Sequence, residues 1–260
     1  MISGREISIV IPVLNEKNNI NCLLSEMDSM TSDYGFSQIQ EVIFVDDGSS
    51  DGTVEAIKSN MDKHNYLVKV VERNSKLGTV NATITGCNVA TSEAIVVMDG
   101  DLQHPPHVII EMARRMHDGY DLIVASRHVT GGRNMWKPLR GVISRVAIFI
   151  SHLVIPSTRA IKDPTSGFFM ARKDFILKLS PLEKRAKILL YVLSSFPAMK
   201  TLEIPYTFVD RKNGTSKIVG MNIGFITGYL IEVIGYMKLA SHYRTTKNSG
   251  ISNSISNVLE

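Results

Sequence analysis

The hydrophobic and polar residues of the first half of the chain follow two alternating patterns. Short runs rich in valine and isoleucine, such as residues 95–97, have the composition of strands buried in a parallel sheet. Between these runs, apolar residues recur every three or four positions, which indicates helices; one such series is Ile20, Leu23, Leu24 and Met27. Strands that alternate with helices form βαβ units, so we expect an α/β protein with a mostly parallel sheet flanked by helices.

The two patterns locate the individual elements. We expect strands over residues 6–12, 41–45, 67–72, 94–98 and 121–126. We expect helices over residues 17–30, 53–60, 79–90 and 107–117.

Beyond Arg127 the alternation becomes less regular. Here we expect helices over 138–155, 183–195 and 218–240, and strands over 168–172 and 201–208. The apolar and polar composition divides the chain into a main domain over 1–217, a helical segment over 218–244 and a flexible Ser/Asn-rich tail over 245–260.

Composition favours one large domain in a reducing environment. A hydrophobic fraction of 44% in 260 residues is ample for a core. Cys22 and Cys87 both fall on predicted helices and have no metal-ligand spacing, so we expect reduced thiols. The first apolar run, residues 7–14, is short and contains Pro12, so no signal peptide is predicted. We expect a protein that faces the cytoplasm.

Charge is distributed unevenly along the chain. Residues 1–130 carry 10 Lys/Arg and 18 Asp/Glu, whereas residues 131–260 carry 19 Lys/Arg and 7 Asp/Glu. The charges suggest two anionic partners. The acidic half suits an anion that binds through a cation, and the basic half suits an anion that binds directly. Because the basic residues are interleaved with long aliphatic runs, a membrane surface fits better than nucleic acid.

Two carboxylates follow the strand predicted over 94–98. Asp99 and Asp101, with the amide of Gln103, offer oxygen ligands to a hard divalent cation, Mg2+ or Mn2+. Such an ion usually carries a phosphate. Taken alone, a pattern this short also fits an ordinary turn whose aspartates cap the next helix.

Further acids follow the first two predicted strands. Glu16, Asp46 and Asp47 join the two aspartates at one edge of a parallel sheet, where ligands of such sheets bind. Asp46 or Asp47 could accept hydrogen bonds from the ribose or base of a nucleotide. The chain has no glycine-rich phosphate loop, so a metal would supply most of the charge opposite a diphosphate.

Six ordered motifs extend this interpretation. Three of them resemble the inverting GT-A glycosyltransferases of family 2: residues 11–16, 46–53 (Asp-Asp-Gly-Ser-Ser-Asp-Gly-Thr) and 99–106 (Asp-Gly-Asp-Leu-Gln-His-Pro-Pro). The other three are similar to those of the short, archaeal-type dolichyl-phosphate mannose synthases of that family: residues 125–132, 163–169 and 211–217. The resemblance covers about residues 5–240.

The resemblance implies a GT-A fold and transfer of mannose from GDP-mannose to dolichyl (polyprenyl) phosphate. It assigns the metal ion on the donor diphosphate to Asp99, Asp101 and Gln103. It assigns contacts with the nucleotide to Pro12, Glu16 and Asp47. Arg127 matches an arginine near both phosphates, and we name it with Asp101 as catalytic. Positions associated with the lipid phosphate are Arg140, Ser144 and Arg211, with Lys217 as an additional donor.

This reaction needs no general base. The nucleophile is a phosphate oxygen that is already anionic at neutral pH, unlike a sugar hydroxyl. In-line positioning and arginines that hold two anionic substrates together are what the site must supply. A single displacement then inverts the anomeric carbon.

The C-terminal helical segment is the predicted contact with a membrane surface. Residues 218–237 are mostly apolar and long enough to span a bilayer. Glu232 would be costly in hydrocarbon, so we favour an amphipathic interfacial helix over a span or a soluble core helix. The 138–155 helix is a second candidate, and together they predict peripheral attachment at the cytoplasmic face of a membrane.

Two alternatives stay open. One is a polyprenyl-phosphate glucosyltransferase that uses UDP-glucose. The other is a non-catalytic subunit that binds a sugar nucleotide within a membrane complex, which would require a membrane partner subunit.

Overall fold

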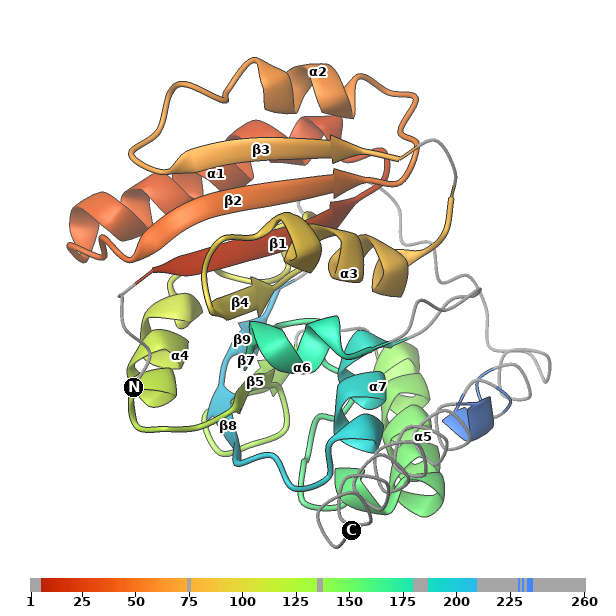
Figure 1. Cartoon of the computed structure of the whole chain (residues 1–260). Coiled ribbons are helices and arrows are strands. Elements are labelled where there is room, and N and C mark those ends of the chain that lie inside the picture. Colours follow the sequence, from red (N-terminus) through yellow and green to blue (C-terminus); the bar gives the residue numbers. More distant parts are fainter. Residues whose placement is uncertain are drawn as a thin grey trace, which may run out of the picture.

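A seven-stranded sheet organises the chain (Figure 1). The computed structural model describes residues 6–73, 76–134, 138–179, 187–209, 229, 231 and 233–235. The strand order is β3-β2-β1-β4-β7-β5-β8. The strands are β1 (Ile7–Val13), β2 (Ile39–Asp46), β3 (Leu67–Glu72), β4 (Ala94–Val97), β5 (Leu122–Ser126), β7 (Phe169–Arg172) and β8 (Thr201–Pro205). The α/β class and the mostly parallel sheet are therefore confirmed.

Helices cover both faces of the sheet. They are α1 (Lys17–Asp33), α2 (Thr53–Lys58), α3 (Thr79–Val89), α4 (Val108–His117), α5 (Pro138–Val154), α6 (Lys173–Leu177) and α7 (Ile188–Ser195). A short 3-10 helix, Pro156–Thr158, follows α5. Side chains of α1 and α4 belong to the core on one face, and those of α3, α6 and α7 belong to the core on the other.

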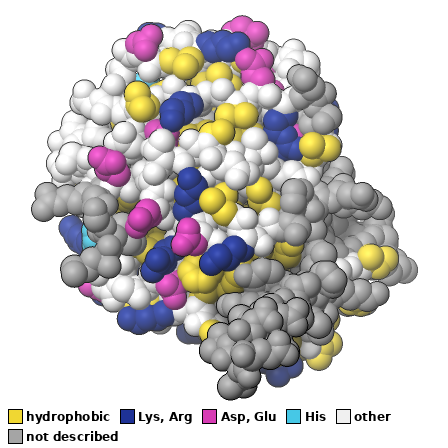
Figure 2. All heavy atoms as spheres, viewed as in Figure 1, with side chains coloured by type: hydrophobic (Ala, Val, Ile, Leu, Met, Phe, Trp, Pro, Cys, Tyr) yellow, Lys and Arg dark blue, Asp and Glu magenta, His cyan; other side chains and the backbone are white. Residues whose placement is uncertain are grey.

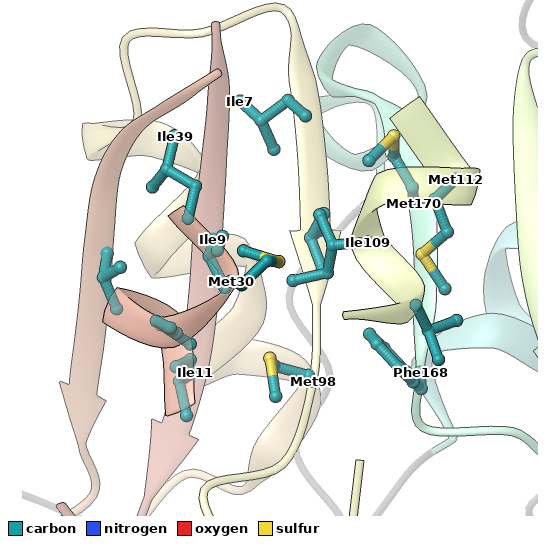
Figure 3. Close-up of a cluster of buried hydrophobic side chains, with 14 of the residues drawn as sticks. Ile7, Ile9, Ile11, Met30, Ile39, Met98, Ile109, Met112, Phe168 and Met170 are labelled. Atoms are coloured by element: carbon teal, nitrogen blue, oxygen red, sulfur yellow. The ribbon is translucent and has the colours of Figure 1, made fainter. Parts of the chain in front are cut away.

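The two cores follow from alternation along the strands. In β1, Ile9 and Ile11 point into the first core and Val10 into the second, because successive strand residues face opposite sides. Figure 3 shows the first core, where Met30 of α1 and Ile109 of α4 meet the isoleucines of the sheet. The side chains of Ile9, Val10, Ile11, Met30 and Ile109 are all buried. Complete burial of one such side chain contributes about 1.5–3 kcal/mol to the stability of the fold.

The sheet departs from the predicted pattern at β7. This strand lies between β4 and β5 and runs antiparallel to both. The predicted range, 168–172, is confirmed, but its direction depends on the path of the chain through α5, which no local pattern encodes.

The predicted strand 201–208 is wrong as a single strand. The backbone N–H of Tyr206 bonds to the carbonyl of Ser126, and the chain then leaves the large sheet. The next residues form β9 (Thr207–Phe208), which pairs with β6 (Arg133–Asn134) in a separate two-stranded sheet. Neither β6 nor α6 was predicted, since both are too short to show a period.

Much of the C-terminal region lies outside the described residues, including the proposed boundaries at 217 and 244 and the tail. The described residues 229, 231 and 233–235 are helical. Tyr229 and Val233 are buried, and the hydroxyl of Tyr229 lies 2.8 Å from that of Ser151 in α5. In the part of the chain that the structure describes, no helix is both long and apolar enough to cross a membrane.

Charge on the surface is mixed. On the described part of the face in Figure 2, acidic and basic side chains are interspersed, with hydrophobic side chains between them. The uneven charge of the two sequence halves therefore does not form a patch of one sign on this face.

Candidate active site

The carboxyl ends of β1, β2 and β4 meet at one edge of the sheet. Val13 is the register partner of Asp46, and its carbonyl accepts the N–H of Asp47 at 3.0 Å. The N–H of Met98, just past β4, bonds to the carbonyl of Val10. These contacts bring the acidic loops after the three strands together, as the sequence predicted. Pro12, in β1, pairs in register with Val45 at the same edge.

Hydrogen bonds join the first two loops. Asn15 has a left-handed backbone (φ 55°); its N–H bonds to the hydroxyl of Ser49, and its side-chain oxygen accepts the N–H of Ser50. The N–H of Glu16 donates to the Thr53 hydroxyl at 2.9 Å. The position of Glu16 is therefore set by the β2–α2 loop.

The carboxylates of Asp46 and Asp47 bind backbone amides of the protein itself. One oxygen of Asp46 accepts the N–H groups of Gly48 and Ser49, which forms the turn after β2. Asp47 accepts the N–H groups of Leu77 and Gly78 at 3.1 and 3.0 Å, which holds the loop before α3. Both residues thus shape the rim of the predicted nucleotide site.

Arg73 is a residue of this edge that sequence reasoning missed. It follows β3, and its backbone N–H bonds to the carbonyl of Asp46. Its side chain is 8% exposed, and its Nη1 lies 3.6 Å from a carboxylate oxygen of Asp47. Among the described residues, neither Nη atom has a hydrogen-bond partner. The available signal was a basic residue directly after β3, whereas acids follow β1, β2 and β4.

The loop after β4 holds the predicted metal ligands. Leu102 has a left-handed backbone (φ 64°) and a buried side chain, which separates Asp101 from Gln103. The N–H of Gln103 donates to Asp101, and its side-chain amide donates to the carbonyl of Val209 at 3.0 Å. The carboxylate of Asp99 is half exposed, whereas the other two residues are buried.

The donor set of this loop fits a divalent cation that also binds a ligand. Carboxylate and amide oxygens are hard donors, as Mg2+ and Mn2+ prefer. Across residues 6–209 with their gaps, and the few described beyond them, no group of three or more His, Cys, Asp or Glu could hold a metal ion alone. Asp99, Asp101 and Gln103 would therefore form part of a coordination shell, with the remaining positions supplied by a ligand such as a diphosphate.

Arg127 directly follows β5. Its N–H and Nε bond to one oxygen of Asp163 at 3.0 and 2.7 Å, and its Nη2 bonds to the other at 2.6 Å. Both side chains are buried. Burial opposes the charge of each, but the hydrogen bonds between them outweigh it, so the pKa of Asp163 is lowered and that of Arg127 raised. The guanidinium also lies 5.5 Å from the ring centre of Phe208.

The turn after Arg127 leaves no room for a side chain at Gly132. A Cβ there would lie 2.6 Å from the carbonyl oxygen of Ser126. Gly131 and Gly132 therefore allow the chain to fold back over the end of β5.

The predicted acceptor residues are described only in part. Ser144 lies in α5 and is buried. Arg140 lies in the first turn of α5, and its side chain is outside the description. Arg211 and Lys217 lie outside the described residues. The structure thus brings the donor-side residues and Arg127 together, and the acceptor set stays a prediction.

Comparisons with known proteins identify a family and several relatives. The model of the family "Glycosyl transferase family 2" matches residues 8–180. Dolichol-phosphate mannosyltransferase from Pyrococcus furiosus is 37% identical over 221 residues, 84% of this chain and 60% of that protein. The protein of the same name from Saccharomyces cerevisiae is 32% identical over 83% of this chain and 82% of its own length.

A solved structure has a similar fold. Glucosyl-3-phosphoglycerate synthase from Mycobacterium tuberculosis, in complex with Mn2+, UDP and glucosyl-3-phosphoglycerate, superposes with a TM-score of 0.64. The alignment covers 90% of this chain and 79% of that one at 19% identity. At this identity the likeness concerns the fold, and it supports the GT-A architecture.

Proposed function

The chain belongs to glycosyl transferase family 2, and we propose that it transfers mannose from GDP-mannose to dolichyl or another polyprenyl phosphate, releasing GDP. The observation that carries the proposal is the identity with two dolichol-phosphate mannosyltransferases, 37% and 32%, over more than four-fifths of the chain. The chain spans 60% of the length of the Pyrococcus furiosus relative, and the proposal concerns the region they share.

On the donor side, the loop after β4 would bind the diphosphate. Asp99, Asp101 and Gln103 would hold Mg2+ or Mn2+, and the bound ion would neutralise charge that develops on the departing GDP. Arg73, with Asp47 beside it, lies at the end of β3, where the nucleotide would meet the rim. Pro12, Glu16 and Asp46 belong to the same rim, and we assign the nucleoside to it.

On the acceptor side, Arg127 would position the lipid phosphate. Asp163 holds one edge of its guanidinium through Nε and Nη2, so the arginine loses little side-chain entropy when an anion binds. Arg140, Ser144, Arg211 and Lys217 complete the proposed acceptor site. The phosphate oxygen attacks the anomeric carbon directly, and no residue is assigned as a base.

The proposed acceptor is a membrane lipid, so the protein needs a membrane-facing surface. One side of α5 exposes Val142, Phe149 and Leu153. The helical residues around Tyr229, which contacts Ser151 of α5, expose Ile231 and Ile234. We assign these residues to a surface that lies on the cytoplasmic face of a bilayer.

Transfer from radiolabelled GDP-mannose to dolichyl phosphate, with Mn2+ present, tests this proposal. We expect a labelled lipid from the purified wild type and at least a hundredfold less from Asp101→Ala, since removal of a metal ligand costs several kcal/mol of transition-state stabilisation (~3 kcal/mol corresponds to that factor). Asp118→Ala, an exposed aspartate at the end of α4, is the matched control.

Three outcomes separate this proposal from its competitors. No transfer, with UDP stabilising the protein against heat more than GDP, would favour a UDP-glucose enzyme. No transfer with either donor until a membrane subunit is added would favour a binding subunit. Equal product from Asp101→Ala and the wild type would contradict the assigned metal site.

A further inference from the structure

His104 lies beneath Asp99 in the loop after β4. Its ring is 2% exposed, and its Nδ1 accepts the backbone N–H of Asp99 at 3.0 Å. A ring nitrogen that accepts has no proton, so the proton of the neutral ring is on Nε2. That Nε2 lies 3.9 Å from Oδ2 of the same aspartate. One imidazole therefore faces both the backbone and the carboxylate of Asp99.

Three aromatic rings hold this imidazole in place. Phe168 stacks on it at 5.1 Å between ring centres, and Tyr206 and Phe208 present their edges at 6.0 and 5.8 Å. We call these three residues the aromatic box. Since Arg127 lies over Phe208, the box also connects the loop of Asp99 to the arginine on β5.

Gly167 closes the remaining side. A Cβ at this position would lie 3.2 Å from Oδ2 of Asp99 and 3.3 Å from Cε1 of His104. The backbone at Gly167 thus packs directly against both the Asp99 carboxylate and the His104 ring. Any larger residue would have to displace one of them.

We propose that His104 is a positioning residue that orients the Asp99 carboxylate toward the divalent cation of the donor site. The inference rests on the proposed function in that Asp99 is taken as a metal ligand. His104 does not bind the metal or substrate. It acts through the accepted N–H, which fixes the Asp99 backbone, and through Nε2–H, which faces its carboxylate. Partners of this kind, behind the ligands, typically change metal affinity about 10–100-fold.

Four variants separate positioning from packing. His104→Phe keeps a stacked ring and removes both polar contacts. His104→Asn places an oxygen near the position of Nδ1 and restores the acceptor. Gly167→Ala retains the His104 side chain and presses on both the Asp99 carboxylate and the His104 ring. Phe168→Leu is the matched packing control, because it weakens the aromatic box without touching a polar atom.

The measurement is Mn2+ affinity of the GDP-bound protein, by electron paramagnetic resonance of free Mn2+, without any turnover. We expect His104→Phe and Gly167→Ala to weaken binding about tenfold or more, and Phe168→Leu to stay within about threefold. His104→Asn should lie between the wild type and His104→Phe, because it keeps the acceptor but lacks Nε2–H. Circular dichroism melting of each variant shows which proteins are folded. If His104→Phe does not fold, His104→Asn carries the test, because it loses Nε2–H and keeps the acceptor; wild-type Mn2+ affinity in this variant would contradict the role of the Nε2–H group.

Two results with the variants would overturn the inference: wild-type Mn2+ affinity in folded His104→Phe, or an equal loss of affinity in Phe168→Leu. A wild type that binds no Mn2+ with either nucleotide would overturn it as well. A parallel titration with UDP keeps the donor question separate. Tighter Mn2+ binding with UDP than with GDP would contradict the proposed donor, and the ranking of the four variants would still decide the role of His104.

Discussion

Arg127 keeps its charge inside the protein because Asp163 is buried with it. The two residues are 36 positions apart and meet where β5 ends and the turn before β7 begins. Two charges removed from water are stable only when geometry and hydrogen bonds compensate for lost hydration. Three hydrogen bonds to one carboxylate meet that condition here. The orientation of the proposed acceptor arginine is thus decided by a residue that needs no contact with substrate.

Replacement of Asp163 by asparagine tests this dependence. We expect Asp163→Asn to lower the free energy of unfolding by about 3–5 kcal/mol, because the buried guanidinium of Arg127 loses its counter-charge. Urea denaturation measures the change in the free energy of unfolding. We also expect the rate of mannosyl transfer by Asp163→Asn to be lower than that of the wild type. Asp118→Asn removes an aspartate whose ion pair with Arg115 is exposed, and we expect less than about 1 kcal/mol there. A similar small change in both variants would contradict the importance of the buried pair.

At the scale of the elements, Glu41 joins several strands at the edge opposite the site. It lies in β2 and is completely buried. Its carboxylate accepts the hydroxyl of Ser8 in β1, the N–H and hydroxyl of Thr91 before β4, and the ammonium of Lys69 in β3. Burial opposes ionisation, but these hydrogen bonds outweigh it and lower the pKa of Glu41 from 4.5 to about 2.

The lowered pKa predicts how stability depends on pH. A depressed carboxyl pKa contributes stability above the unfolded value, and that contribution is lost as pH falls through the folded value. Glu41→Gln should therefore be less stable than the wild type by roughly 3 kcal/mol at pH 7. The difference should shrink as pH decreases from 4.5 toward 2, as measured by urea denaturation. Glu72→Gln, which breaks an exposed pair with Lys58, serves as the control, with less than about 1 kcal/mol expected.

At the scale of the whole molecule, the proposed lipid acceptor requires a membrane-facing side. Helix α5 packs on the second core, on the sheet face opposite α1 and α4. Its exposed apolar residues lie on the outer side of that helix. Phe149 and Leu153 are 67% and 65% exposed. A side chain of this size contributes about 1.5–3 kcal/mol when it leaves water for an apolar phase.

Vesicle binding tests the assignment of that surface. We expect the double variant Phe149→Ser/Leu153→Ser to bind vesicles of mixed anionic and neutral lipid at least about tenfold more weakly than the wild type. Sedimentation with vesicles measures the bound fraction. Leu67→Ser, at an exposed leucine of β3 away from α5, should bind like the wild type. If the double variant sediments as the wild type does, another part of the chain contacts the lipid.

Local sequence patterns were enough to predict the helices, the strands and the acidic residues of the donor side. Strand and helix periods are local, so the ranges of β1 to β5 and α1 to α5 were predicted to within a few residues. The acids at the strand ends were also predictable, because parallel strands present their carboxyl ends at one edge. The resemblance of six motifs named the reaction that we propose.

The contacts that hold those residues in place could be seen only in the folded protein. The antiparallel β7, the burial of Arg73, the pairing of Arg127 with Asp163 and the contact of His104 with Asp99 depend on packing. Apart from the His104 contact, they join segments far apart in the chain. A polar side chain has the same local pattern whether it faces solvent or a buried partner. Its partner is selected by the folded arrangement, in which a buried charge must find a counter-charge.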